Sequence, residues 1–422
     1  MYDGYSDNSN DSGCGIKVEF KNQVNIFNVK FYDNNCEDGV INVRDTLTLN
    51  IGQAEINSNS ADYGLVVINN DVTNTHINEL DIYDNTINLD SIMLIRSPNV
   101  DINHLDMYDN FAVGIMNIPN DGGTSSQTLL DIRLQNSSFV RNEATKNIVV
   151  IDSFLRHSGE SGGMDVNIDN VTIADNSTSF FPPLMLSSSG QYTPTKGIDG
   201  VISNLTIANN NRSGDVGMDI SAAMIFISFG SSPSGVALQN ILLANNLDEG
   251  TPRNCSDIFD PPMFWPASTG NNLSDDDTCN NVFNHVNDLN DIDAGLNPLE
   301  EDNGTWVLPL QVNSPTIDGG VTVSGMTTDQ RGMARPQNNA FDIGAYETVL
   351  GVDTSNSNQS GGNSEQGNNA SNNSDSNMGN ISGNLGETGT TILSTSLLLS
   401  VAMSTIVASK RLIKNTRAHY KR

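Results

Sequence analysis

One short segment carries the densest local group of side chains that could exchange protons. Within residues 156–165 the chain places Arg156, His157, Glu160 and Asp165. Glycoside hydrolysis requires two carboxyl groups positioned across the scissile bond, and lyase chemistry requires a basic residue beside a bound Ca²⁺. Neither arrangement is present as a recognisable motif. Exposed loop polarity explains these residues equally well, so we predict no catalytic site and retain the four as the candidates for one.

Aspartates stand directly before an asparagine at similar places in the chain. Asp84 and Asp109 are the closest pair, and Asp33 and Asp175 occupy the same position elsewhere. If these residues stack on neighbouring strands about 4.8 Å apart, their like charges destabilise each other. Either solvent screens the charges or a Ca²⁺ ion bridges the carboxylates of Asp84 and Asp109. We favour solvation, and therefore predict no cofactor.

The four cysteines are expected to form disulfide bonds. Cys14 and Cys36 lie 22 residues apart, and Cys255 and Cys279 bracket a loop. The expected bridges are Cys14 to Cys36 and Cys255 to Cys279, although four cysteines allow three connectivities. Neither pair has the CxxC spacing of a zinc or redox site. The sequence therefore predicts an exterior location and no thiolate metal site.

The composition restricts the scaffold that must position these residues. The 422 residues include 50 Asp and Glu against 20 Lys and Arg, a net charge of −30, and 36% are hydrophobic. This acidic excess disfavours nucleic acid and anionic membrane surfaces as partners. The aromatic content of only 6% predicts a core that is thin or repetitive for a chain of this length.

The chain contains a repeat that ends in asparagine. The pattern apolar-x-polar-apolar-x-apolar-x-x-Asn is clearest in INELDIYDN (residues 77–85) and INHLDMYDN (residues 102–110). Its copies are spaced 25 to 36 residues apart, which indicates a solenoid. The apolar stretches are short and alternating, which favours strands. We predict a β-solenoid whose stacked asparagine amides form a ladder at Asn34, Asn59, Asn85, Asn110, Asn142, Asn176, Asn210 and Asn246.

Two further features follow from the repeat. The residue six positions before each of these asparagines is polar and predicts a second internal ladder at Asn28, Asn136, Asn170, Asn204 and Asn240. The later copies are longer, and residues 156–163 and 187–197 are expected to be loops grown from one turn. Such loops are where a binding surface is expected, although they could equally be longer turns.

The coils resemble right-handed parallel β-helix repeat proteins. Residues 240–347 are similar to the choice-of-anchor Q domain, most clearly in TTDQRGMARPQNNAFDIGAYE (residues 327–347), where DQRG, ARP and DIGAYE occur in order. The resemblance implies a surface protein that ends in an anchoring signal. It implies no reaction.

The same closing region is expected to act as a cap. A solenoid exposes a strand edge at each end, and the edge must be covered to prevent aggregation. We prefer a structural charge network to a catalytic carboxylate pair for the charged residues Asp329, Arg331, Arg335, Asp342 and Glu347. We expect Trp265 and Trp306 to pack in the cap, with a carbohydrate-stacking platform as the alternative.

The C-terminal part resembles a tripartite sortase sorting signal. Residues 390–409 contain no charge, and 20 residues of helix span a bilayer core of about 30 Å. Basic residues follow the run, which predicts a cytoplasmic tail. The resemblance implies cleavage between Thr388 and Gly389, and a simple transmembrane tether is the alternative. The pentapeptide, in which glycine replaces the usual proline, comprises Leu385, Gly386, Glu387, Thr388 and Gly389.

These observations predict an all-β protein: a right-handed parallel β-helix at 1–246, a capping region at 247–350, a disordered stalk at 351–389, one transmembrane helix at 390–409 and a basic cytoplasmic tail at 410–422. The start lacks a signal peptide, so we expect an N-terminally incomplete version of a longer gene product.

We interpret the chain as a non-catalytic cell-surface protein, adhesin-like or envelope-organising. It would attach to the cell envelope or membrane through its C-terminus and present a surface to a glycan or protein ligand. The alternative is a polysaccharide lyase or glycoside hydrolase built on the same scaffold.

Overall fold

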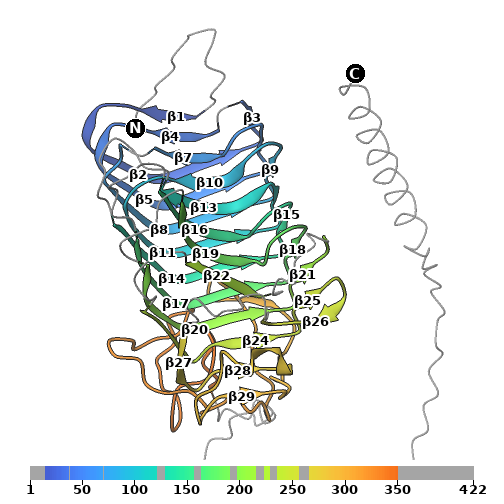
Figure 1. The fold of residues 1–422 in the computed structure, drawn as a ribbon. Coiled ribbons are helices and arrows are strands. Elements are labelled where there is room, and N and C mark those ends of the chain that lie inside the picture. The colour runs from blue at the N-terminus through green and yellow to red at the C-terminus, as the bar shows by residue number, and fades with distance from the viewer. Residues whose placement is uncertain are drawn as a thin grey trace, which may run out of the picture. The chain divides into compact units, whose positions relative to one another are not determined.

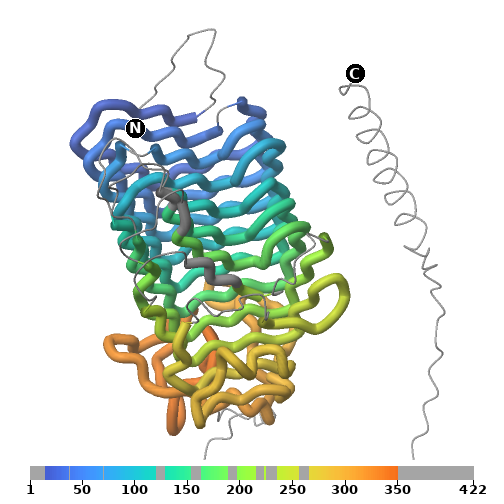
Figure 2. The backbone as a smooth tube through the Cα atoms, in the orientation of Figure 1, coloured from blue at the N-terminus to red at the C-terminus, as the bar shows by residue number. Residues whose placement is uncertain are grey.

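The computed structural model describes residues 15–37, 39–69, 71–120, 129–155, 163–190, 197–214, 223–228, 235–255 and 266–349. These residues form coils of short parallel strands that stack on one another, as in a β-solenoid (Figure 1). They contain no α-helix, only the 3₁₀ turn η1 (Asp277–Cys279). The backbone trace follows the coils in order along the stack (Figure 2). The prediction of stacked parallel β-strands is confirmed.

Three sheets run along the solenoid, and each coil up to Asp248 contributes a strand to each sheet. Sheet A has the order β1 (Ile16–Val18), β4 (Ile41–Val43), β7 (Val66–Ile68), β10 (Ser91–Ile95), β13 (Gly114–Asn120), β16 (Val149–Leu155), β19 (Leu184–Gly190) and β22 (Met224–Ser228). Sheet C has two-residue strands in the order β3 (Asn35–Cys36), β6 (Ser60–Ala61), β9 (Thr86–Ile87), β12 (Phe111–Ala112), β15 (Glu143–Ala144), β18 (Ser177–Thr178), β21 (Asn211–Arg212), β25 (Leu247–Asp248) and the antiparallel β26 (Thr251–Pro252).

Sheet B contains the long strands and carries most of the surface discussed below. Its strands are β2 (Lys21–Tyr32), β5 (Thr46–Asn57), β8 (Asn74–Tyr83), β11 (Asn99–Tyr108), β14 (Leu130–Val140), β17 (Met164–Ala174), β20 (Ile198–Ala208), β23 (Gly235–Gln239), β24 (Leu242–Ala244), β27 (Ala267–Gly270), β28 (Leu273–Ser274) and β29 (Leu289–Asn290). Parallel pairing thus continues beyond residue 246, where the sequence analysis ends the solenoid.

Identical positions of successive coils lie directly above one another, so the core consists of columns of aliphatic side chains. The first apolar residue of the repeat forms one such column, in which Ile51 pairs with Ile77 and Ile77 with Ile102. All three are buried, with 1% or less of each residue exposed. Each coil therefore buries few side chains, but it buries them against both neighbouring coils, which suits a sequence of low hydrophobic content.

Each long strand of sheet B bends at one residue with a left-handed backbone, at φ between 47° and 64°. Asparagine tolerates this conformation well, which explains the polar residue six positions before each repeat asparagine. The predicted second ladder forms in part. Asn170 donates to Oδ1 of Asn136 at 3.1 Å, and Asn240 donates to Oδ1 of Asn204 at 2.8 Å. Asn28 is exposed, whereas Asn240 is buried where its amide exchanges two hydrogen bonds with the backbone of Val321. The bent residues are Asn28, Gln53, Glu79, His104, Asn136, Asn170, Asn204 and Asn240.

The predicted asparagine ladder is confirmed. In each coil the side-chain amide of the repeat asparagine donates to Oδ1 of the next one, at 2.8 to 3.1 Å. The same Oδ1 also accepts the backbone N–H of the preceding asparagine. Every side chain thus joins two coils and satisfies a backbone group at the turn, and from Asn59 to Asn246 all are buried.

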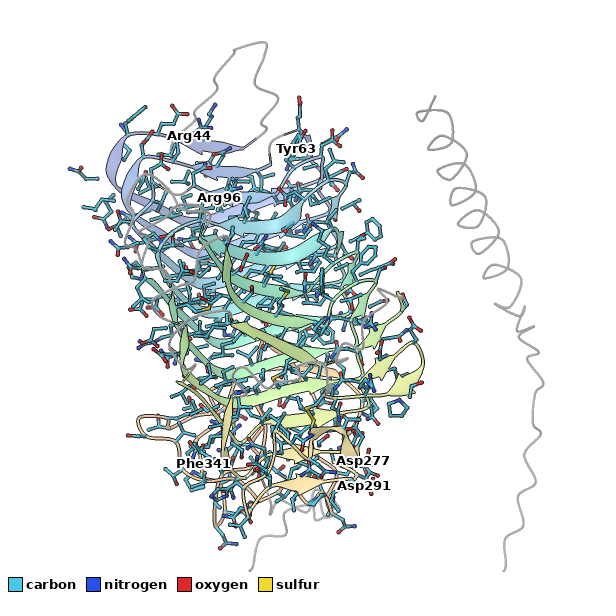
Figure 3. The ribbon with its side chains drawn as sticks, viewed as in Figure 1. Arg44, Tyr63, Arg96, Asp277, Asp291 and Phe341 are labelled. Atoms are coloured by element: carbon cyan, nitrogen blue, oxygen red, sulfur yellow. A yellow bond between two sulfur atoms is a disulfide. The ribbon has the colours of Figure 1, made fainter. Side chains whose placement is uncertain are left out.

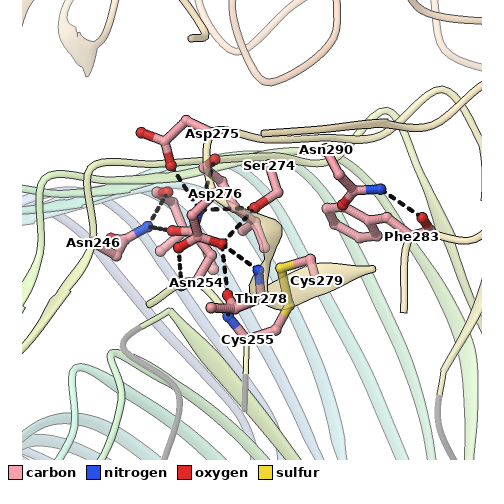
Figure 4. The surroundings of a disulfide bond; sticks show 12 residues. Asn246, Asn254, Cys255, Ser274, Asp275, Asp276, Thr278, Cys279, Phe283 and Asn290 are labelled. Carbon is pink, nitrogen blue, oxygen red and sulfur yellow. Dashed lines mark hydrogen bonds between the residues drawn. A yellow bond between two sulfur atoms is a disulfide. The ribbon is translucent and has the colours of Figure 1, made fainter. Parts of the chain in front are cut away.

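A disulfide bond lies beside the end of this ladder (Figure 4). Cys255 and Cys279 form the bridge that the sequence predicts, with 5.0 Å between their Cα atoms. Asn246 donates to Oδ1 of Asn254 at 2.9 Å, and the backbone N–H of Cys255 donates to Thr278 at 3.0 Å. For the other predicted bridge, Cys36 is buried and Cys14 lies outside the described residues.

Residues 291–349, the closing segment, pack on the outer face of sheet B. They include a hairpin of β30 (Glu300–Asp302) and β31 (Thr305–Val307). Thr305 donates to Asp106 at 2.9 Å, and the backbone N–H of Ala345 donates to Thr206 at 2.9 Å. Gly344, at φ 101°, allows this approach because a Cβ there would lie 2.6 Å from Thr206 Oγ1. The segment therefore spans several coils of sheet B.

A second apolar core fills the space between sheet B and the closing segment. On the sheet side it contains Ala174, Ala208 and Ala244, and on the other side Leu308 and Ile343. Figure 3 shows Phe341 of this segment at the opposite end of the solenoid from Arg44. Small outward side chains in the later coils thus mark the area that the segment covers.

Candidate functional site

Most of the loop proposed for acid-base chemistry lies outside the described residues. Arg156, His157 and Glu160 belong to that part of the chain. Asp165 is described, and it lies in β17 in register with Asp131 on one side and Asp199 on the other. Of the four candidates, the structure therefore places Asp165 alone, in a column of three aspartates on sheet B.

The aspartates considered for calcium all occupy one backbone position. Asp84 and Asp109 have φ values of 54° and 55°, in the left-handed region that aspartate tolerates. Asp109 accepts two hydrogen bonds from the Arg141 guanidinium, at 2.7 and 2.8 Å. Among the residues that the structure describes, no group of three or more potential ligands could hold a metal ion. The left-handed backbone of the turn thus accounts for an aspartate at this position.

The charged residues of the closing segment meet in a buried network. Arg331 contacts Asp329 at 2.7 Å, and Arg335 contacts Glu347 at 3.3 Å. Arg335 also donates to the carbonyl oxygens of Asp342 and Gly344, at 3.0 and 2.8 Å. Burial lowers the pKa of Arg335 and raises the pKa values of Glu347 and Asp342. Since backbone N–H groups also donate to these carboxylates, the network fixes the segment's shape.

The C-terminal anchoring elements cannot be placed. The described residues do not include the stalk at 351–389, the apolar run at 390–409 or the tail at 410–422. They also do not include the pentapeptide, which comprises Leu385, Gly386, Glu387, Thr388 and Gly389. Trp265 lies outside them as well. Within the described ranges, no helix is long and apolar enough to cross a membrane.

The structure reveals a column of carboxylates that the sequence analysis did not select. Glu55, Asp81 and Asp106 occupy the same position of β5, β8 and β11 and pair directly across the sheet. Neighbouring parallel strands lie about 4.8 Å apart, so these like charges would destabilise the sheet unless other groups offset them. The surroundings of each carboxylate therefore determine its state.

Each carboxylate of this column has different partners. Glu55 forms an ion pair with Lys30 and accepts a hydrogen bond from Tyr83 at 2.5 Å, and these hydrogen bonds lower its pKa. Asp106 accepts from Ser138 and Thr305, yet burial raises its pKa to about 6. Asp81 has no hydrogen bond or ion pair among the described side chains, and its partial burial raises its pKa.

Aromatic side chains line the same face. The rings of Tyr83 and Tyr108 stack with centroids 4.8 Å apart and planes within 5°. Trp306 of β31 lies against Tyr108, with 5.6 Å between centroids, and the Arg141 guanidinium lies 3.9 Å above the Trp306 ring. We call Glu55, Asp81, Tyr83, Tyr108 and Trp306 the tyrosine-carboxylate patch. It lies where the closing segment ends and the open face of sheet B begins.

The buried carboxyl group of Asp106 makes stability depend on pH. Its pKa rises from 3.8 to about 6 on folding, so the folded state binds the proton more tightly. Between these pH values the free energy of unfolding should fall as pH rises, by about 3 kcal/mol. Replacing Asp106 with asparagine should remove this dependence and stabilise the protein at pH 7. Urea unfolding at pH 4 and pH 7 measures both effects.

The matched control for this variant is Asp131→Asn, which removes the same charge from an exposed position of sheet B. It should leave the pH dependence close to that of the wild type. If Asp106→Asn and Asp131→Asn change the pH dependence of stability equally, the burial of Asp106 is not the cause of that dependence.

A signal for the patch is present in the repeat. The two clearest copies, INELDIYDN and INHLDMYDN, share an aspartate and a tyrosine at outward positions, namely Asp81 with Asp106 and Tyr83 with Tyr108. Searching the outward positions for recurring acidic and aromatic residues, and not only the asparagine that marks the register, would have found them. Glu55 and Trp306 lie outside both copies, and folding alone brings them into the patch.

No protein-family model matches this chain, and no curated protein or solved structure matches it either. Its function must therefore be inferred from the chemistry of the patch.

Proposed function

We propose that this protein is a non-catalytic glycan-binding protein of the cell surface, and that glycans bind at the tyrosine-carboxylate patch. The stacked Tyr83 and Tyr108 beside the carboxylates of Glu55 and Asp81 carry the proposal. A sugar ring presents apolar C–H faces and a rim of hydroxyl groups. Tyrosine offers an apolar ring with a polar tip, and a carboxylate accepts several hydroxyl hydrogen bonds.

Burial of Asp106 favours binding without catalysis. Its side chain is only 2% exposed, because Ser138 and Thr305 cover it. A catalytic acid must come within hydrogen-bond reach of the glycosidic oxygen. Asp106 could do so only if the closing segment moved away. Asp81 and Glu55 remain partly exposed and suited to holding hydroxyl groups.

The proposal includes attachment to the cell envelope or membrane through the C-terminus. The similarity of residues 240–347 to the choice-of-anchor Q domain supports it, as do the polar stalk, the uncharged run and the basic end. The coils are proposed to be right-handed, the hand that twisted parallel strands impose on their connections. The large negative charge would keep such a protein soluble.

Replacing Tyr83 with alanine tests the proposed site. This change removes an aromatic face and the hydrogen bond to Glu55, so binding of the best oligosaccharide from a glycan array should weaken at least about tenfold. Tyr83→Phe keeps the ring and should retain most of the affinity. Calorimetric titration measures all three proteins.

Tyr63→Ala is the control, since Tyr63 is an exposed tyrosine outside the patch. It should bind as the wild type does. The proposal fails if Tyr83→Ala binds as tightly as Tyr63→Ala while both have the wild-type melting temperature.

Glycoside hydrolysis is the second candidate function, and one observation favours it. Glu55 has a lowered pKa and Asp106 a raised one, which is the division expected of a base and an acid. They lie two coils apart, about 9.6 Å between strands, which is just above the carboxyl separation of about 6.5 to 9.5 Å in inverting enzymes. Mass spectrometry of oligosaccharides incubated with the protein decides between the two functions, since shortened products that disappear in Glu55→Gln indicate hydrolysis.

A further inference from the structure

The tyrosine-carboxylate patch has a surplus of negative charge at its centre. Asp81 lies between Glu55 and Asp106 in the column, and the carboxylates of Glu55, Glu79 and Glu301 act on it as like charges. Charges of one sign directly opposite each other destabilise a sheet. A ligand that supplies positive charge at Asp81 would therefore remove a repulsion as well as form a contact.

The nearby cations are already occupied. Lys30 is paired with Glu55, and Arg141 makes its two hydrogen bonds to Asp109. His104 lies 3.8 Å from Asp106 Oδ2. Asp81 is thus a half-buried carboxylate to which no described side chain donates a hydrogen bond.

Asp106 provides a second, independent indication. Its carboxylate is almost fully buried, and Oδ1 accepts from Thr305 and Ser138. Oδ2 accepts no hydrogen bond from the described residues, and His104 Nε2 lies 3.8 Å from it. A buried carboxylate oxygen without a hydrogen bond is costly, and a cation bound at the neighbouring Asp81 would reduce that cost through its charge.

We propose that the patch selects glycans that carry free amino groups, with the ammonium group bound at Asp81 and the sugar ring against Tyr83. This inference rests on the proposed glycan-binding function. An ammonium is a compact charge with three donors, so it suits a site with more carboxylate than cation. The net charge of −30 additionally disfavours polysaccharides of uronic acids.

Calorimetric titration with three tetrasaccharides tests the inference. The probes are glucosamine tetramer, N-acetylglucosamine tetramer and galacturonate tetramer, at pH 6 and low salt. Glucosamine tetramer should bind at least about tenfold more tightly than the acetylated probe, because only it carries the charge. Raising the salt concentration should reduce this advantage, because the site is only half buried.

Two variants locate the effect. Asp81→Asn should bind glucosamine and N-acetylglucosamine tetramers with similar affinity. Asp131→Asn, which removes an equal charge from another strand of sheet B, should keep the preference. Asparagine at position 81 relieves repulsion, so the melting temperature should not fall. The salt series on the wild-type protein still tests the inference if that variant does not fold.

The outcomes separate the inference from the proposed function. The role of the amino group is overturned if the wild type binds the amino and acetylated probes equally. It is also overturned if Asp81→Asn keeps the preference for the amino probe. Neither result contradicts the proposed glycan binding. Tighter binding of galacturonate tetramer also overturns it. If none of the probes binds and the glycan array is also empty, the proposed function fails together with the inference.

Discussion

Replacing Asn110 with alanine is expected to lower the free energy of unfolding by about 3 to 5 kcal/mol, because several buried hydrogen bonds are lost together. The Asn110 amide donates to Oδ1 of Asn142 at 3.0 Å and to the carbonyl of Ile82 at 2.8 Å. Its Oδ1 accepts both the backbone N–H and the side chain of Asn85, at 3.1 and 3.0 Å. Alanine would leave these donors and the acceptor buried and unpaired. Urea unfolding followed by circular dichroism gives the change.

Asn103→Ala is the matched control, because Asn103 lies on the same strand and also stacks its amide with neighbouring coils. Its hydrogen bonds join it to Asn78 at 2.9 Å and to Asn136 at 2.8 Å, and the first of these is exposed to solvent. Water replaces the lost partners there, so the cost should be about 1 kcal/mol or less. Equal costs for the two variants would show that burial of the ladder at Asn110 contributes nothing.

Replacing Arg335 with methionine should release the closing segment. Arg335 and Glu347 are both fully buried, and removing one partner of such a pair costs about 3 to 5 kcal/mol because the other charge remains without compensation. The carbonyl oxygens of Asp342 and Gly344 also lose their donor. We expect proteolytic cleavage within residues 291–349 at protease concentrations that leave the wild type intact, with the coils of β5 to β20 still resistant. Limited proteolysis with mass spectrometry measures this.

Two comparisons test the cause. Arg133→Met removes an exposed arginine from sheet B and should leave the protease pattern unchanged. Combining Arg335→Met with Glu347→Gln removes the uncompensated charge and should recover part of the resistance. If the double variant is cleaved faster than Arg335→Met alone, the buried pair is not what holds the segment in place.

The asparagine spacing was sufficient to predict the stacked strands and the ladder. One asparagine per coil has to occupy the same turn and accept the backbone N–H of the neighbouring coil. The outward column two positions before each repeat asparagine also carried information that was not used. It reads Tyr83 and Tyr108 in the early coils, and Ala174, Ala208 and Ala244 in the later ones. Small residues allow another segment to approach, so this change marks where the closing segment lies.

The state of the carboxylates could not be predicted in the same way. Asp81 and Asp106 occupy one position of two neighbouring repeats and look equivalent in the sequence. They differ because Thr305, 199 residues further along the chain, covers Asp106 and leaves Asp81 partly open. A local pattern contains no information on such a distant contact. The burial of one carboxylate, and with it the charge surplus at the patch, emerges only in the folded chain.

The asparagine ladder also has an evolutionary consequence. Each asparagine requires only another asparagine at the same bend of the next coil, so one coil can replace another at every junction in the ladder. The hydrogen bonds of the ladder alone would therefore allow a gene segment that encodes one coil to be duplicated or deleted. The coil length can also vary, since sequence separations of 25, 32 and 36 residues join asparagines through the same hydrogen bonds. Duplication of such a gene segment would lengthen this protein by one whole coil.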